Sequence, residues 1–148
     1  MSRVAASIFI PASPGEVWDL VMNADRLGDW VTIHRRLEQA DEGAPRAGYE
    51  MAQRLHLRGV DLKVHWTLVE VDPGRKAVWE GRGPARSHAH TEYKLTAEDD
   101  GTRFDYVNEF VAPLGPIGAV ASRALVGGMP EREANRSLER LRGLFDGS

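Results

Sequence analysis

The sequence contains no cysteine. A disulfide framework, a thiolate nucleophile and a sulfur-ligated metal site are therefore excluded. Positive charge is not in excess either, because 19 basic residues stand against 22 acidic ones and give a formal net charge of -3 at pH 7. The basic residues are scattered instead of forming a stripe, so nucleic acid is not an expected partner of this chain.

Long hydrophobic runs are missing as well. No segment approaches the roughly 20 apolar residues of a membrane-spanning helix. The short apolar stretch that ends at Pro11 lacks the long core and the cleavage site of a secretory signal, so we expect a cytoplasmic protein. Arginine far outnumbers lysine, and alanine and glycine are abundant, which suggests a GC-rich genome such as a bacterial one.

The familiar catalytic signatures are also absent. The sequence has no Gly-x-Ser-x-Gly nucleophile elbow, no phosphate loop, no dinucleotide-binding Gly-x-Gly-x-x-Gly and no His-Glu-x-x-His. Enzymes that depend on a nucleotide or on a serine nucleophile are therefore disfavoured, and we expect no cofactor. Whether the protein is an enzyme of another kind stays open at this point.

The N-terminal part has the pattern of one strand followed by helices. An apolar strand should end at Pro11, and Ser13 can cap a helix whose first turn holds Pro14 and Glu16. A second short helix should follow around Asp25. The N-terminal part therefore predicts a strand that leads directly into two short helices.

The middle of the chain alternates between apolar and polar residues, which is typical of strands in a sheet with one buried face. The alternation is clearest in residues 60–68 and, before them, in residues 49–57. Arg58-Gly59 between the two runs is a plausible tight connection. We therefore expect these two strands to form a hairpin.

Turn signals divide the rest of the expected sheet. Asp72-Pro73-Gly74 is a strong turn signal, because proline presets one backbone angle and glycine accepts the positive angle of the next residue. It predicts a strand at residues 76–81. Residues 81–84 should interrupt the pairing, residues 87–95 should resume it, and a last strand is expected at residues 102–111.

The C-terminal residues 116–145 carry the pattern of an amphipathic helix. Its apolar stripe comprises Val120, Ala124, Gly127, Ala134, Leu138, Leu141 and Phe145. Its expected solvated side comprises Arg132, Glu133, Arg136, Glu139, Arg140 and Arg142. The segment from Gly127 to Pro130 favours a break, so we expect either a kink or hinge between two helices or an ordinary helix start with Pro130 in its first turn.

Four local patterns, taken with the order of the expected elements, resemble the START-like (SRPBCC) superfamily. The patterns are the segments from Pro14 to Trp18 and from Leu27 to Trp30, Val71-Asp72-Pro73, and Gly101-Thr102-Arg103. This superfamily includes polyketide cyclases, aromatases and lipid-transfer proteins. The resemblance covers nearly the whole chain and implies a single START-like ligand-binding domain over residues 1–148.

The resemblance also implies an α+β architecture, the helix-grip fold. In this fold a curved antiparallel sheet, here of six or seven strands, wraps around a long C-terminal helix, and a ligand cavity lies between the two. Binding, transport, cyclisation and regulation all occur on this scaffold, so the fold does not name an activity.

Side chains that alternate inward on the expected strands would line such a cavity. We expect ligand contacts from Trp30, Tyr49, Met51, Gln53, Val64, Trp66, Trp79, Ala89, Thr91, Tyr93, Phe104, Tyr106, Asn108, Phe110, Val120 and Ala124. A mostly apolar wall with a few polar groups suits a small hydrophobic or aromatic molecule, such as a lipid, a quinone or a polyketide-like compound. Some of these side chains should instead simply pack against the helix.

Tyr93, Tyr106 and Asn108 are the candidate catalytic residues, because a phenol and an amide that face a cavity can orient and polarise a carbonyl group. An inward Asn108 needs a hydrogen bond, since a buried amide without a partner costs about 1–3 kcal/mol. Its partner could be either tyrosine, Gln53, a water molecule or a ligand oxygen. No inward acid, histidine or lysine is evident as a base, which weighs against an enzyme.

His65, His88 and His90 have a spacing that would permit a zinc site with three nitrogen ligands. The strand faces that carry these histidines also carry Lys63 and Glu92, as a solvated outer surface does. We therefore expect no metal site.

Three functions stay open. The first is a binding protein that encloses a small hydrophobic molecule. The second is an enzyme similar to the polyketide aromatase/cyclases, which would show turnover. The third is a protein-interaction module, for which an exposed apolar patch and a very small cavity would be diagnostic. The sequence leaves the oligomeric state open, a homodimer included.

Overall fold

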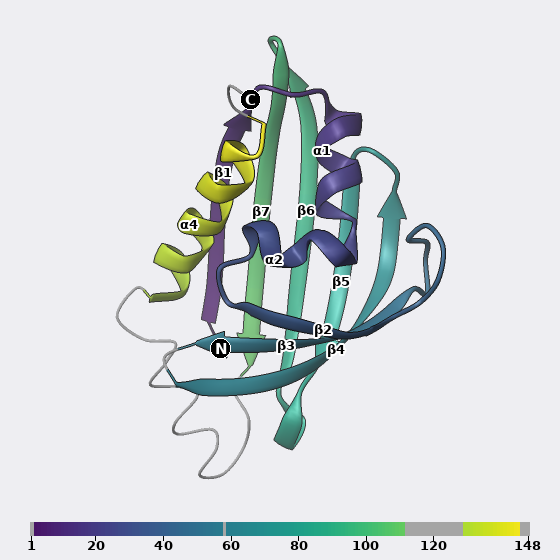
Figure 1. Ribbon diagram of the computed structural model, residues 1–148, viewed down its shortest axis with the longest axis vertical. Coiled ribbons are helices and arrows are strands. Elements are labelled where there is room, and N and C mark those ends of the chain that lie inside the picture. Colours follow the sequence, from purple (N-terminus) through teal and green to yellow (C-terminus); the bar gives the residue numbers. More distant parts are fainter. Residues whose placement is uncertain (1, 58, 112–128, 146–148) are drawn as a thin grey trace.

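The computed structural model describes residues 2–57, 59–111 and 129–145, and Figure 1 shows their arrangement. The sheet is built from β1 (Ser2–Ile10), β2 (His34–Ala40), β3 (Glu50–Leu57), β4 (Val60–Asp72), β5 (Lys76–Arg82), β6 (His88–Glu98) and β7 (Gly101–Val111). These seven strands pair in the order β1-β7-β6-β5-β4-β3-β2, and every pairing is antiparallel. The sheet is bent, so that β2 and β3 run across the direction of β6 and β7 (Figure 1).

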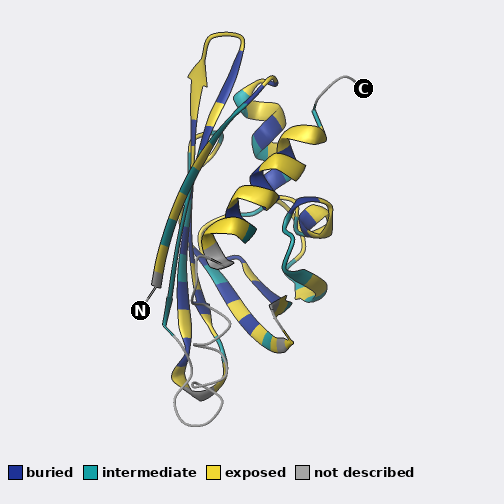
Figure 2. Ribbon diagram, turned by 90° about the vertical axis from the view of Figure 1, so that its left-hand side faces the viewer, coloured by how far each residue is buried: buried dark blue, intermediate teal, exposed yellow. Residues whose placement is uncertain are grey.

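The helices lie on one side of this sheet (Figures 1 and 2). They are α1 (Pro14–Val21), the 3-10 turn η1 (Ala24–Arg26), the single turn α2 (Leu27–Trp30) and α4 (Met129–Gly143). A second 3-10 turn, η2 (Pro84–Arg86), lies in the loop between β5 and β6. Helix α4 contacts β1 and α2, whereas α1 contacts β6 and β7. No helix in the described ranges is long and apolar enough to span a membrane.

The predicted cap of α1 is confirmed. The Ser13 hydroxyl accepts a hydrogen bond from the Glu16 backbone N–H at 3.3 Å and donates to the Glu16 carboxylate at 3.0 Å. This reciprocal pair satisfies one of the free N–H groups of the first turn. Pro14 occupies that turn, and Val17 and Val21 are buried against the sheet.

The predicted hairpin of β3 and β4 is confirmed, with Gln53 opposite Val64 and Met51 opposite Trp66. Val64 and Trp66 are buried, whereas His65 between them is exposed. The alternation in the sequence therefore assigns the two faces correctly.

The predicted turn at Asp72-Pro73-Gly74 is also confirmed. The Arg75 N–H donates to the Asp72 carbonyl at 2.9 Å, and Gly74 has a φ of +80°. A residue with a side chain rarely adopts this angle, so glycine suits the position.

The predicted interruption at residues 81–84 is wrong at its start. Gly81 still pairs with Ala89, and Arg82 pairs with His88. Glycine lacks a side chain but keeps the N–H and C=O groups of the ladder, so β5 continues through it. A Cβ on Gly81 would lie 2.7 Å from Val64 and 2.8 Å from Trp66, and the glycine therefore makes room for two inward side chains.

The core lies between the sheet and the helices (Figure 2). Its largest fully buried side chains are Trp30, Phe104, Ile10, Leu68, Leu138, Leu141, Val17 and Thr102. The predicted stripe of the C-terminal helix is confirmed where it is described, because Ala134, Leu138 and Leu141 are buried. The stripe residues Val120, Ala124 and Gly127 lie outside the described residues, as does most of the predicted break. The described helix begins at Met129, with Pro130 as its second residue.

Candidate ligand-binding site

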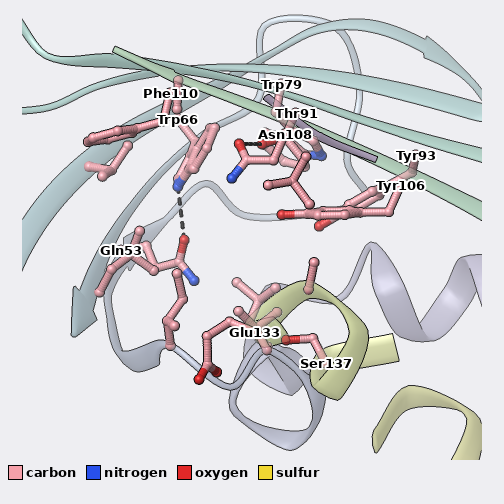
Figure 3. A pocket seen from close by; sticks show the side chains of 18 of the residues that line it. Gln53, Trp66, Trp79, Thr91, Tyr93, Tyr106, Asn108, Phe110, Glu133 and Ser137 are labelled. Carbon is pink, nitrogen blue, oxygen red and sulfur yellow. Dashed lines mark hydrogen bonds between the residues drawn. The ribbon is translucent and has the colours of Figure 1, made fainter. Parts of the chain in front are cut away.

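A cavity of about 140 Å³ lies between the inner face of the sheet and the helices α2 and α4 (Figure 3). Most of the residues predicted to contact a ligand line it. These are Trp30, Met51, Gln53, Val64, Trp66, Trp79, Ala89, Thr91, Tyr93, Tyr106, Asn108 and Phe110. The cavity wall is mostly apolar, as a small-molecule site usually is.

Two predicted contacts belong to the core instead. Tyr49 packs edge-on against Trp79, with 6.1 Å between ring centroids, and Phe104 packs against Trp30 and Tyr93 at 6.2 and 5.4 Å. Both residues alternate correctly but lie beyond the cavity wall. The inner face of the sheet is larger than the cavity, so facing inward is not sufficient to reach it. Val120 and Ala124 are outside the described residues.

The cavity has further lining residues that the sequence did not identify as ligand contacts. They are Val4, Leu27, Val31, Ile33, Leu55, Leu62, Glu133, Ala134, Ser137 and Leu138. A signal existed for some of them: Leu55 and Leu62 continue the inward alternation of the hairpin, and Ala134 and Leu138 belong to the apolar stripe of α4. Val4, by contrast, lies in a short apolar strand with no feature that singles it out.

Glu133 is the main correction, because it was assigned to the solvated side of the helix and lines the cavity instead. Its carboxylate accepts a hydrogen bond from the Thr32 hydroxyl and another from Arg136 at 3.3 Å. Its side chain is 17% exposed. Glu133 precedes Ala134 at the edge of the apolar stripe, and the contact with Thr32 directs it inward. The cavity therefore does have an acid in its wall.

Ser137, one turn after Glu133 on α4, joins the same cluster. Its hydroxyl oxygen accepts a hydrogen bond from the Thr32 backbone N–H at 3.0 Å and lies 3.2 Å from the Thr32 hydroxyl. The segment after α2 is therefore fastened to α4 at the edge of the cavity.

The partner of Asn108 is a residue that the sequence did not suggest. The Thr91 hydroxyl donates to the Asn108 side-chain oxygen at 3.1 Å, and the two residues lie opposite each other on β6 and β7. The cross-strand register thus supplies the hydrogen bond. The Asn108 amide nitrogen is left free to face the cavity (Figure 3).

Gln53 connects the cavity wall to the edge of the sheet. Its oxygen accepts from the Trp66 indole N–H at 2.9 Å, and its nitrogen lies 2.8 Å from His34 Nδ1. An indole N–H can only donate, so Gln53 must donate to His34, whose Nδ1 is then unprotonated. Burial lowers the pKa of His34, which agrees with a neutral imidazole.

Tyr93 and Tyr106 lie opposite each other on β6 and β7, with 6.1 Å between ring centroids. Their hydroxyl groups point into the cavity (Figure 3) and have no hydrogen-bond partner among the described residues. Burial raises the pKa of Tyr106 to about 12 and also raises the pKa of Tyr93. Both phenols therefore stay protonated at neutral pH.

Two tryptophans in the wall carry a further polar group. The indole N–H groups of Trp30 and Trp79 are buried and lack a hydrogen-bond partner within the described part of the chain. Each such group costs about 1–3 kcal/mol.

The histidines of the expected outer surface lie outside this cavity. His65 and His88 are exposed, and His90 lies between two carboxylates, with Nε2 at 2.9 Å from Glu92 and Nδ1 paired with Glu80. These carboxylates raise the pKa of His90. Within residues 2–57, 59–111 and 129–145 there is no group of three side chains that could hold a metal ion.

A second hollow, of about 320 Å³, is lined partly by exposed polar residues, among them Glu50, His65 and Arg82. It is larger than the first but lacks the apolar enclosure that a hydrophobic ligand needs. The cavity between the sheet and α4 is therefore the candidate site.

Sequence comparisons find relatives that align over most of this chain. Toxin Rv0910 of Mycobacterium tuberculosis H37Rv is 25% identical over 127 residues, which cover 84% of this chain and 88% of that protein. Protein Rv1546 of the same organism is 26% identical over 152 residues, covering 98% and 99% of the two chains.

The crystal structure of TTHA0849 from Thermus thermophilus has the same fold. It superposes with a TM-score of 0.76 over 96% of this chain and 95% of that chain, at 21% identity.

The family model described as polyketide cyclase / dehydrase and lipid transport matches residues 1–146. The expected START-like fold family is thereby confirmed, and the chain belongs to the polyketide cyclase/dehydrase and lipid transport family.

Proposed function

We propose that this protein is a single ligand-binding domain, over residues 1–148, that encloses a small hydrophobic or aromatic molecule between the sheet and the C-terminal helix. The observation that carries the proposal is the cavity, whose wall is mostly apolar with a few polar groups. This composition is typical of small-molecule sites. A lipid, a quinone and a polyketide-like compound would all suit such a wall. We also propose that the protein is cytoplasmic.

The size of the cavity limits what it encloses. An empty apolar cavity of about 150 Å³ in another protein holds a benzene molecule, and the cavity described above measures about 140 Å³. The enclosed part of the ligand is therefore on the scale of one aromatic ring. A larger ligand must extend beyond the cavity or displace part of its wall.

An aromatase/cyclase-type enzyme is the second candidate, and Glu133 is the observation that favours it. Aldol cyclisation needs a base that removes a proton beside a carbonyl and donors that stabilise the resulting oxyanion. Glu133 can be that base, and Tyr106 and Asn108 can be the donors. The test is to incubate the protein with a poly-β-ketone and to measure turnover by mass spectrometry, as the loss of water from the compound.

Matched variants separate catalysis from binding. If the protein is an enzyme, its catalytic rate should fall more than its affinity in the variants Glu133→Gln, Tyr106→Phe and Asn108→Ala. Glu131 is exposed on the same helix, so the control variant Glu131→Gln should keep the wild-type rate. A wild-type protein that binds the polyketone without turning it over removes the enzyme candidate.

A protein-interaction module is disfavoured by the described surface. Its large exposed hydrophobic residues are only Val69 and Leu144, in the parts of the chain that the structure describes. Two such residues do not make the apolar patch that a docking surface needs.

The binding proposal is tested with a denatured extract of the purified protein, searched by mass spectrometry for a co-purified hydrophobic compound. A thermal-shift panel of lipids, quinones and aromatic polyketides runs in parallel, because a ligand that binds only the folded state raises its stability. The proposal expects a bound compound or a saturable shift. A clean extract with no shift across the panel would contradict it.

The variant that should abolish the shift is Ala89→Trp. Ala89 is 5% exposed and lines the cavity, so an indole there fills the space of the ligand. Ala97→Trp makes the same change at an exposed position of β6 and should keep the shift. If both variants retain ligand binding, the ligand lies elsewhere.

A further inference from the structure

A chain of three side chains connects the edge of the sheet to the cavity wall. The buried Trp66 indole N–H donates to the Gln53 oxygen at 2.9 Å (Figure 3), and the Gln53 nitrogen lies 2.8 Å from Nδ1 of His34. Gln53 and Trp66 line the cavity, whereas His34 on the edge strand β2 does not. A residue outside the cavity is therefore linked by hydrogen bonds to a donor in its wall.

Only one arrangement of protons satisfies both hydrogen bonds. An indole N–H can only donate, and a carboxamide donates only from its nitrogen. Gln53 must therefore accept from Trp66 and donate to His34, so that Nδ1 of His34 carries no proton. The direction of the Gln53 amide in the cavity wall thus depends on a neutral imidazole at the edge of the sheet.

A protonated His34 is incompatible with this arrangement. Both ring nitrogens of an imidazolium are donors, so Nδ1 would face the Gln53 nitrogen, another donor, at 2.8 Å. Turning the amide over gives the imidazolium an acceptor, but it places the Gln53 nitrogen against the Trp66 N–H. Gln53 can then serve only one of its two neighbours, and the buried indole loses its acceptor.

The surroundings of His34 favour its neutral form. Gly28 of α2 lies against the ring, since a Cβ there would be 3.4 Å from Cδ2 of His34, and the apolar Leu55 is opposite His34 on β3. Burial lowers the pKa of His34, so the charged form appears only in acid. The charged side chains on the elements around it pair with one another: Arg26 with Asp29, Arg36, Arg54 and Lys63 with Glu38, Arg35 and His56 with Asp61, and Arg136 with Glu133.

We propose that His34 is a positioning residue that makes the cavity sensitive to pH: its protonation reverses the Gln53 amide, frees the Trp66 N–H and weakens the binding of an apolar ligand. The effect on the ligand rests on the proposed function. An apolar ligand excludes the water that would otherwise satisfy the freed N–H, and a buried donor without a partner is costly. By linkage, the proton weakens the ligand by the same factor as the ligand weakens the proton.

The Trp66 indole signal in proton–nitrogen NMR spectra of the full chain tests the reversal between pH 8 and pH 5. It should move with the same midpoint as the ring signals of His34. In His34→Asn an amide oxygen takes the place of Nδ1 and does not titrate, so the Trp66 signal should keep its pH 8 position. His88→Asn removes an exposed histidine and should keep the wild-type response.

Gln53→Glu is a second variant with the opposite expectation for His34. Both oxygens of a carboxylate accept, so Glu at this position can accept from Trp66 and from a protonated His34 at the same time. The ring signals of His34 should then titrate at a higher pH than in the wild type, and the Trp66 signal should no longer follow them. Thermal unfolding at each pH shows which variants are folded.

Ethylbenzene is the ligand probe, because this one-ring compound, unlike acetophenone, has no oxygen that could accept the freed N–H. Its dissociation constant for the wild type should rise about fivefold or more between pH 8 and pH 5. In His34→Asn the dissociation constant should stay constant over the same range.

The outcomes separate this inference from the proposed function. A Trp66 signal that does not follow the titration of His34, or that moves equally in His34→Asn, would overturn the reversal of the amide. An ethylbenzene affinity that is the same at both pH values would overturn the effect on the ligand. If ethylbenzene does not bind at either pH while Trp66 follows His34, the proposed function fails and the reversal is supported.

Discussion

Polar side chains on the two faces of the sheet differ in how fully they are paired. On the outer face, Glu38 lies 3.0 Å from both Lys63 and Arg54, and these partners lower the pKa of Glu38 to about 2. His90 is likewise enclosed by two carboxylates. Outer polar groups thus satisfy one another in water, where each pair contributes little to stability.

On the inner face, polar groups are fewer and are only partly satisfied. Thr91, the neighbour of His90 in sequence, uses its hydroxyl on Asn108, but the buried indole N–H of Trp79 has no partner among the residues that the structure describes. A natural protein rarely leaves buried polar groups unpaired without a reason. The difference agrees with an outer face that is solvated and with the ligand site that we propose on the inner face.

The largest expected effect comes from truncating an apolar residue of the inner face. Phe104 is fully buried, whereas its neighbour Arg103 has a side chain 51% exposed and pairs with Asp105 at 3.3 Å. Phe104→Ala should lower the free energy of unfolding by about 3–5 kcal/mol, and Arg103→Ala by no more than about 0.5 kcal/mol. Urea denaturation measures both, and similar losses would show that the two faces do not differ in this way.

Adding one methyl group to the inner face should have the next largest effect. In Gly81→Ala the new Cβ would lie 2.7 Å from Val64 and 2.8 Å from Trp66, so overpacking should cost about 1–3 kcal/mol. Gly15→Ala in α1 meets no atom within 4 Å and should be neutral or stabilising by about 0.5–1 kcal/mol. A loss of stability in Gly81→Ala without a loss in Gly15→Ala, measured by thermal unfolding, supports the crowded inner face, and a tolerated Gly81→Ala refutes it.

Removing the inner hydroxyl should cost less. Thr91→Val keeps the shape of the side chain but leaves the Asn108 oxygen without its donor, so we expect a loss of about 1 kcal/mol in the free energy of unfolding. Thr96→Val on the same strand is exposed and should change stability by less than about 0.5 kcal/mol. Equal urea midpoints for the two variants would mean that the Thr91–Asn108 bond does not contribute.

The smallest expected effect is a pH dependence of opposite sign at two histidines. Carboxylates raise the pKa of His90, so its contribution to stability is complete below its unfolded value of about 6.5 and is lost as the pH rises through the folded value. Burial lowers the pKa of His34, so its contribution is present above about 6.5 and is lost as the pH falls through the folded value.

Unfolding at two pH values tests these signs. His90→Gln should lose more stability at pH 5.5 than at pH 8, and His34→Gln should lose more at pH 8 than at pH 5.5. The same pH trend in both variants would mean that the two imidazoles do not have the opposite environments described.

The sequence predicts well whatever depends on neighbours along the chain. The cap at Ser13, the turn at Gly74 and the β3–β4 hairpin all follow from local residue order, and the structure has each of them. The apolar stripe of α4 is set by the helical period in the same way.

The sequence fails where a contact between distant segments decides. Glu133 lies at the boundary of its helix stripe, and Thr32, which is far away in sequence, turns it toward the cavity. Asn108 receives its hydrogen bond from Thr91 because of the strand register, which alternation alone does not specify. Phe104 and Tyr49 face inward as predicted, but packing against other rings places them in the core.

The most direct test of the central claim uses the tryptophans as reporters. Of the four tryptophans, Trp30, Trp66 and Trp79 line the cavity, and Trp18 in α1 does not. When acetophenone is added to the wild-type chain, the indole N–H signals of the three cavity tryptophans should shift in a saturable way, while the Trp18 signal stays in place. Signals that do not move, or a shift confined to Trp18, would contradict a ligand-binding cavity between the sheet and the helix.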